Sequence, residues 1–126
     1  MHDSRTILLV DDDRDVRETL AEILEDEGFH THQASSGRAA LDWILAADPK
    51  PALVVLDLMM PDMDGYQFVE ERDRRPELRM VPVIVLTAHD VTGSSPLPAA
   101  EAWFAKPLDM ERFLEAVNGF VAADAP

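Results

Sequence analysis

The stretch LVVLDLMMPDMDG, residues 53–65, decides the fold of this 126-residue chain. Its apolar run, Leu53–Leu56, is short and contains β-branched residues, which is typical of a parallel strand buried on both faces. Asp57 follows the run directly, and a turn rich in Asp and Gly then leads into a helical pattern. Ligands of open parallel sheets bind beyond the carboxyl ends of the strands. Asp57 therefore stands where such a fold places its chemistry.

Similar apolar runs lie on both sides of this segment. Ile7–Val10 and Val83–Leu86 are continuous and predict two more central strands. Phe29–Ala34 has polar alternation, and Ala102–Ala105 is short, so we expect these two to be outer or later strands. Five strands in total are predicted.

Helical patterns separate the strands, each with apolar residues at helical spacing and a cap or breaker at its ends. They run from about Val16 to Gly28, from Ser36 to Asp48, from Gly65 to about Arg75, where Pro76 stops the helix, and from Asp109 to Val121. Strands that alternate with helices predict an α/β fold with a parallel sheet and right-handed crossovers. We expect one domain over residues 1–126, with its core at about 6–121 and no output domain.

The fourth βα unit departs from this pattern. Residues 90–100 read DVTGSSPLPAA, with Gly93, Pro96 and Pro98 where a helix is expected. Because proline lacks the backbone N–H and restricts the residue before it, we expect a short or irregular fourth helix.

Composition limits the possible functions. The formal net charge is −14, with only 11 Lys and Arg residues, which argues against binding to nucleic acid or to anionic membranes. No apolar run approaches the roughly 20 residues of a membrane-spanning helix, and the start of the chain does not resemble a signal peptide. The chain has no cysteine, so it has no disulfide or thiolate metal site. We expect a soluble cytoplasmic protein.

Polar side chains follow four of the five predicted strands. Carboxylates supply hard oxygen ligands for Mg²⁺, and a carboxylate can also act as a nucleophile toward phosphorus. A hydroxyl and an ammonium group can hold the oxygens of a phosphoryl group during its transfer. The residues at these strand ends are Asp11, Asp12, Asp57, Thr87 and Lys106. The sequence thus predicts Mg²⁺-assisted phosphoryl transfer to Asp57.

Four motifs carry a family resemblance: VDDDRDVR from Val10, LDLMMPDMDG from Leu56, LTA from Leu86 and AKP from Ala105. They resemble the receiver domain of response regulators, the CheY-like phosphoproteins of two-component signalling. The resemblance implies a flavodoxin-like (βα)5 fold with strand order 2-1-3-4-5.

The same resemblance implies a role for each matched residue. Asp57 would be the phosphoacceptor, and the Mg²⁺ ligands would be Asp11, Asp12, Asp57 and the main-chain carbonyl of Met59. Thr87 and Lys106 would sense the phosphoryl group, and Trp103 would take the switch-aromatic position. Pro107 would follow Lys106 through a cis bond.

The implied function is a phosphorylation switch in a phosphorelay. A histidine kinase or phosphotransfer protein would donate the phosphoryl group, and the changed surface would bind or release an unknown protein partner. The chain would assist only its own phosphorylation and dephosphorylation and would not be an enzyme otherwise. Residues Met59 and His89 lie where the family tunes dephosphorylation.

Other interpretations remain beside these. The chain could be a degenerate receiver that binds partners without phosphorylation, a hypothesis supported only by the irregular residues 90–100. An aspartyl phosphatase usually needs a general acid two residues after its nucleophile, and Met59 cannot donate a proton there. Asp13 and Asp15 are better explained as helix-cap or turn residues than as ligands. Trp103 could equally be core packing, Trp43 is expected to pack, and His89 is expected to lie in a solvated loop.

Overall fold

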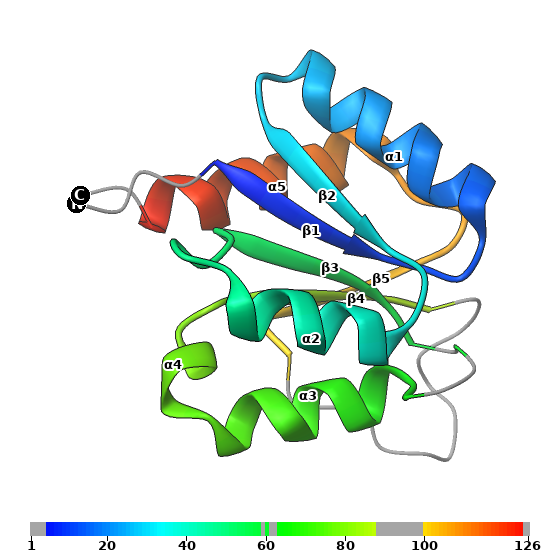
Figure 1. Ribbon diagram of the computed structural model, residues 1–126. Helices are drawn as coiled ribbons and strands as arrows, with labels where there is room; N and C mark the ends of the chain where they lie inside the picture. Colours follow the sequence, from blue (N-terminus) through cyan, green and yellow to red (C-terminus); the bar gives the residue numbers. More distant parts are fainter. Residues whose placement is uncertain (1–4, 59, 61–62, 88–99, 125–126) are drawn as a thin grey trace.

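The computed structural model describes residues 5–58, 60, 63–87 and 100–124 (Figure 1). The elements along the chain are β1 (Thr6–Val10), α1 (Arg14–Asp26), β2 (His30–Ala34), α2 (Gly37–Ala46), β3 (Leu53–Asp57), α3 (Gly65–Arg74), α4 (Pro76–Arg79), β4 (Val83–Thr87), β5 (Ala102–Ala105) and α5 (Met110–Asp124).

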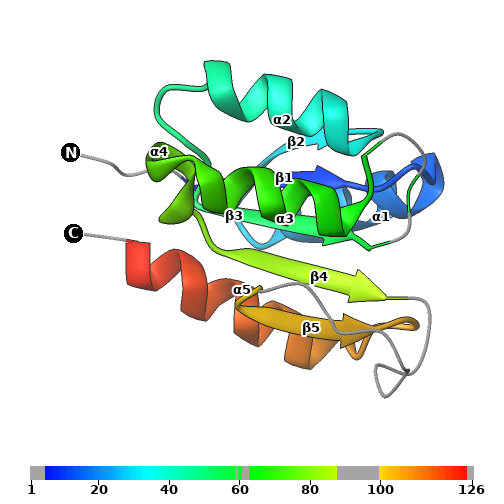
Figure 2. The same cartoon turned by 90° about the horizontal axis from the view of Figure 1, so that it is seen from below.

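The five strands form one parallel sheet. Their order is β2-β1-β3-β4-β5, which confirms the predicted topology. Strand β3 lies at the centre, and all of its residues are buried. Strands β2 and β5 are the two edges, and Figure 2 shows β5 beside β4 at one side of the sheet.

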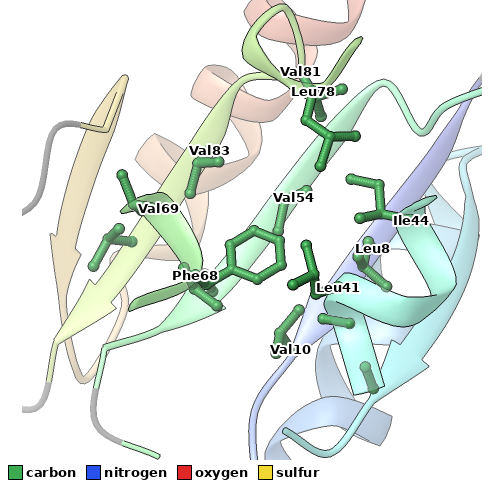
Figure 3. Close-up of a cluster of buried hydrophobic side chains, with 14 of the residues drawn as sticks. Leu8, Val10, Leu41, Ile44, Val54, Phe68, Val69, Leu78, Val81 and Val83 are labelled. Carbon is green, nitrogen blue, oxygen red and sulfur yellow. The ribbon is translucent and has the colours of Figure 1, made fainter. Parts of the chain in front are cut away.

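Helices cover both faces of the sheet. Figure 1 shows α1 and α5 on one face and α2 and α3 on the other. Successive residues of a strand point to opposite faces, so each central strand contributes to two cores. The α2/α3 side contains Leu8, Val54, Val83 and Phe68 (Figure 3). The α1/α5 side contains Ile7, Leu53, Ile84, Leu24 and Phe113.

Side-chain caps begin the helices where the sequence predicted them. The Asp13 carboxylate accepts from the backbone N–H groups of Asp15 and Val16, and Ser36 accepts from Ala39. Asp64 forms a capping box with Gln67, and Asp109 accepts from the backbone of Arg112 at 3.2 Å. These bonds satisfy N–H groups that the first turn of a helix leaves unpaired. Asp13 is therefore a cap, as expected, and Asp15 lies in the first turn of α1.

Two features of the backbone differ from the sequence prediction or go beyond it. Pro76 stops α3, as predicted, but it also begins the one-turn helix α4, because proline suits the first position of a helix. The Lys106–Pro107 bond is cis, which confirms the prediction, and the Asp48–Pro49 bond is cis as well. The irregular helix predicted at residues 90–100 lies outside the described residues except for Ala100.

The two tryptophans have different environments. Trp43 on α2 packs against the core and stacks on His32 of β2, with ring centroids 4.3 Å apart. Its predicted packing role is confirmed. Trp103 on β5 is 39% exposed, so the core-packing interpretation of this residue is wrong.

An ion pair between buried Arg72 and exposed Glu101 anchors the start of β5. The Arg72 guanidinium on α3 donates to the Glu101 carboxylate at 2.8 Å and to the Val81 carbonyl at 3.1 Å. The same Glu101 oxygen accepts from the Val83 backbone N–H at 2.7 Å. This contact joins α3, β4 and the residue that precedes β5.

Within the described parts of the chain, no helix has the length and apolar character needed to cross a bilayer.

Candidate functional site

The residues predicted to carry the chemistry meet at one edge of the sheet. Asp57 is the last residue of β3, and Thr87 is the last residue of β4. Asp11 directly follows β1, and Lys106 directly follows β5. The strands are parallel neighbours, so their carboxyl ends lie together, on the right in Figure 1.

Three carboxylates form a compact cluster. One carboxylate oxygen each from Asp11, Asp12 and Asp57 lies within 4.8 Å of the others. Asp11 is 3% exposed and Asp57 is 7% exposed, whereas Asp12 is exposed to solvent. Burial of ionised carboxylates is costly unless opposite charges or hydrogen bonds compensate for the lost water.

Lys106 supplies part of that compensation. Its ammonium nitrogen lies 3.2 Å from Asp11 Oδ2 and 3.8 Å from Asp57 Oδ2. A backbone bond from Lys106 N to the Thr87 carbonyl, 2.8 Å long, positions the lysine beside the end of β4. Thr87 is itself buried, so its hydroxyl lies in a partly dry environment.

The donor set fits a hard divalent cation. Three ionised carboxylates against one ammonium leave two negative charges, which a cation such as Mg²⁺ would neutralise. Mg²⁺ is held in proteins by one or two carboxylates together with waters and phosphate oxygens. The exposed Asp12 side of the cluster leaves room for those waters. The carbonyl of Met59, the fourth expected ligand, lies outside the described residues.

Backbone contacts hold the loop that follows Asp57. Leu58 N donates to the Leu86 carbonyl, and Gly65 N donates to the Leu58 carbonyl, both at 2.9 Å. A Cβ atom at Gly65 would lie 2.9 Å from Leu58 Cα, and one at Gly37 would lie 2.1 Å from the Met63 carbonyl oxygen. Glycine at both positions therefore lets the backbones approach closely around the loop.

Not every expected site residue lies in the cluster. Trp103, the expected switch aromatic, lies on edge strand β5 with its ring partly exposed, three residues before Lys106. His89, expected in a solvated loop two residues after Thr87, lies outside the described residues.

Sequence reasoning missed Arg17. This α1 side chain donates to the main-chain carbonyl of Asp11 at 2.7 Å and to the Gln33 side chain at 3.3 Å. Its partner at the site is a backbone oxygen, which leaves no signal in the side-chain sequence.

Comparisons with known proteins agree with this geometry. The chain is 36% identical to the response regulator Rre1 of Synechocystis over 93% of its length, and it spans 52% of that protein. It also spans about half of the response regulator MprA of Mycolicibacterium vanbaalenii, at 38% identity. It is 35% identical to sporulation initiation phosphotransferase F of Bacillus subtilis, and the match covers 91% of this chain and 92% of that protein.

Solved structures show the same architecture. The receiver domain of a signal transduction histidine kinase from Syntrophus aciditrophicus has a TM-score of 0.84 at 30% identity, over 94% of this chain and 90% of that one. The chemotaxis protein CheY4 of Vibrio cholerae has a TM-score of 0.79 at 26% identity, over 93% of this chain and 98% of that one. Residues 7–118 match the family described as the response regulator receiver domain. On the sequence match, the strand order and the acidic cluster together, the chain belongs to the response regulator receiver domain family.

Proposed function

We propose that this chain is a phosphorylation switch that accepts a phosphoryl group on Asp57 from a histidine kinase or phosphotransfer protein. The observation that carries the proposal is the position of Asp57. Its carboxylate ends the central strand, 3.8 Å from the Lys106 ammonium and within a cluster of three carboxylates. A lone surface aspartate would have no such surroundings.

The chemistry follows from the groups around Asp57. An Asp57 carboxylate oxygen attacks phosphorus, a new P–O bond forms, and the P–N bond to the donor histidine breaks as the imidazole leaves with the bonding electron pair. Asp11, Asp12 and Asp57 would hold Mg²⁺, which would neutralise charge on the transferring group when bound. Lys106 neutralises one phosphoryl oxygen. Its ammonium group moves from the Asp57 carboxylate to that oxygen, so it keeps a negatively charged partner.

Thr87 connects the site to the rest of the sheet. Its buried hydroxyl is at the end of β4, where it donates to a phosphoryl oxygen on Asp57. Movement of Thr87 toward the phosphoryl group frees space beside β5, and Trp103 responds to that space as the switch aromatic. The changed β4–β5 surface then binds or releases a protein partner.

The chain acts on no other substrate in this proposal. It assists only its own Mg²⁺-dependent phosphorylation and the hydrolysis of its acyl phosphate. The relatives include one protein of similar length and two that are longer. Sporulation initiation phosphotransferase F is similar in length to this chain, whereas Rre1 and MprA are about twice as long.

Intact-protein mass after incubation with acetyl phosphate tests the proposal. We expect one added phosphoryl group that requires Mg²⁺ and is absent from Asp57→Asn. Asp73→Asn, on the exposed side of α3, is the matched control and should still be modified. A wild type that gains no phosphoryl group under conditions that trap short-lived acyl phosphates would contradict the proposal and favour a phosphorylation-independent interaction module.

A further inference from the structure

Arg17 links the candidate site to the neighbouring edge of the sheet. It lies near the start of α1, and its two hydrogen bonds reach different strands. Nη1 donates to the main-chain carbonyl of Asp11, just beyond β1, and Nε donates to the Gln33 side chain on β2. The 2.7 Å bond is short, as expected of a charge-assisted bond from guanidinium to carbonyl.

Asp11 is held at each of its polar groups. Its backbone N–H donates to the Ala34 carbonyl at 3.2 Å, and its carbonyl accepts from Arg17. Carboxylate oxygen Oδ1 accepts from the Asp13 backbone at 2.9 Å, and Oδ2 accepts from Lys106 at 3.2 Å. The side-chain bonds fix the Asp11 carboxylate by themselves. The Arg17 bond acts instead on the peptide unit that follows.

That peptide unit joins the two acidic residues of the cluster. A peptide group is planar, so the direction of the Asp11 carbonyl also sets the direction of the Asp12 N–H and the start of the Asp12 backbone. Asp12 is exposed, so packing restrains its side chain little. The orientation of the Asp12 carboxylate thus depends strongly on the backbone that carries it.

We propose that Arg17 is a positioning residue that holds the Asp11–Asp12 peptide so that the Asp12 carboxylate faces the cation shared with Asp11 and Asp57. The inference rests on the proposed function, because it requires a divalent cation at this cluster. Gln33 is the second anchor of the guanidinium and keeps its plane directed at the Asp11 carbonyl.

Electrostatics and positioning predict opposite effects when the Arg17 charge is removed. A positive charge near a cation site repels the cation, so its loss alone would strengthen binding. Loss of a residue that orients a ligand weakens binding, typically by 10- to 100-fold for groups that contact metal ligands. The sign of the change in affinity therefore distinguishes the two roles.

Arg14 offers a matched control on the same helix. It is exposed and pairs with Glu18 at 2.9 Å. Arg14 Nε donates to the Glu18 carboxylate, and this hydrogen bond raises the pKa of Arg14 above its ordinary value, so the side chain carries the same positive charge as Arg17. Arg14→Met removes the same charge as Arg17→Met, but the contact that it breaks is the ion pair with Glu18 and not a bond to Asp11.

Direct cation binding without any phosphodonor is the first measurement. Mn²⁺ serves as the probe, with the free ion read by electron paramagnetic resonance and Mg²⁺ affinity obtained by competition. We expect Arg17→Met to weaken binding about tenfold and Arg14→Met to leave it unchanged or slightly stronger. Arg17→Lys keeps the charge but loses the bidentate guanidinium donor, and Gln33→Leu removes the second anchor. Each should weaken Mn²⁺ binding by a smaller factor than Arg17→Met.

Phosphorylation by acetyl phosphate over a range of Mg²⁺ concentrations is the second measurement. For Arg17→Met we expect a higher half-saturating Mg²⁺ concentration with a near wild-type rate at saturation. A role in general stability alone would not produce this separation. If Arg17→Met does not fold, Arg17→Lys and Gln33→Leu decide the question by the same two measurements.

The outcomes separate this inference from the proposed function. If the wild type binds Mn²⁺ and becomes phosphorylated while the folded Arg17 variants bind Mn²⁺ as tightly as the wild type, only the positioning role is wrong. If the wild type binds no Mn²⁺ at the cluster, the proposed function itself fails.

Discussion

At the scale of single residues, Lys106 lies between two carboxylates that repel each other when both are ionised. It contacts Asp11 at 3.2 Å and Asp57 at 3.8 Å, and its side chain is 29% exposed. In the proposed switch, the lysine and a bound cation would both neutralise the carboxylates before phosphorylation. One would partly replace the other in stabilising the fold, but of these two only Lys106 would donate a hydrogen bond to a phosphoryl oxygen.

Lys106→Met should therefore destabilise the metal-free protein more than the Mg²⁺ form. We expect a loss of about 1–2 kcal/mol in unfolding free energy with chelator, less than for a fully buried pair because the lysine is partly exposed. Excess Mg²⁺ should recover most of that loss. Urea unfolding with EDTA and with Mg²⁺ measures both values.

Lys50→Met is the control, since Lys50 and Lys106 are the two lysines of the chain. The Lys50 ammonium donates to the carbonyls of Ile44 and Leu45 at the end of α2, and Lys50 precedes β3, whereas Asp57 ends that strand. The loss of unfolding free energy in Lys50→Met should be the same with and without Mg²⁺. An equal Mg²⁺ response in the two variants would contradict the role given to Lys106.

At the scale of elements, the start of β5 depends on the side chain of α3 that reaches it. Arg72 is 6% exposed and contacts Glu101, whereas Arg74, two residues later, is 64% exposed and pairs with Glu70 and Glu71. Exposed ion pairs contribute about 0–1 kcal/mol, but removal of one partner of a buried pair is costly.

The two arginines of α3 therefore make a direct comparison. We expect Arg72→Met to cost about 2–3 kcal/mol, below the range for a fully buried pair because Glu101 can hydrate. Arg74→Met should cost less than about 0.5 kcal/mol. Urea unfolding gives both values, and hydrogen exchange at the Val83 amide, which donates to Glu101, should accelerate in Arg72→Met alone. Similar costs for the two variants would show that burial of Arg72 is unimportant.

Most elements could be predicted from the sequence because each has a local signal. Continuous apolar runs identified β3 and β4, and capping residues placed the starts of α2 and α5, whereas apolar spacing placed the start of α1 at about Val16, two residues late. Helix α4 was missed because Pro76 is both a breaker for the helix before it and a good first residue for the next one. A single proline cannot distinguish these roles in the sequence.

The candidate site was predictable where chemistry lies in side chains at strand ends. Parallel strands bring such residues together whatever the details of packing, so Asp11, Asp57 and Lys106 could be placed in advance. The environment of Trp103 could not be predicted, because the sequence AWFA of β5 does not show which face of an edge strand is covered. The Arg72–Glu101 contact joins residues 29 positions apart, and no local pattern links them.

At the scale of the whole molecule, the chain carries a formal net charge of −14. Self-repulsion of this kind weakens the folded state, and simple salt relieves it by screening. A bound cation acts differently, because it stabilises the folded state by an amount that grows with the logarithm of its concentration divided by its dissociation constant for the formed site.

Mg²⁺ should thus raise the thermal unfolding midpoint beyond the effect of NaCl at equal ionic strength. At a concentration 100 times the dissociation constant, we expect about 2.7 kcal/mol of added stability. Asp12→Asn combined with Asp57→Asn should respond to both salts alike, and calorimetry can test this. An equal response of the wild type to the two salts would mean that the acidic cluster is not a specific cation site.

The two tryptophans can also serve as intrinsic fluorescence probes, because they lie at opposite edges of the sheet. Trp43 stacks on His32 at the β2 edge, and Trp103 lies partly exposed on β5 at the opposite edge. A variant that keeps only one indole reports on one side of the sheet, through the quenching of its emission and its accessibility to acrylamide. Stopped-flow fluorescence of the two variants after mixing with phosphodonor can therefore measure the rate of change at each edge of the sheet separately, without an attached dye.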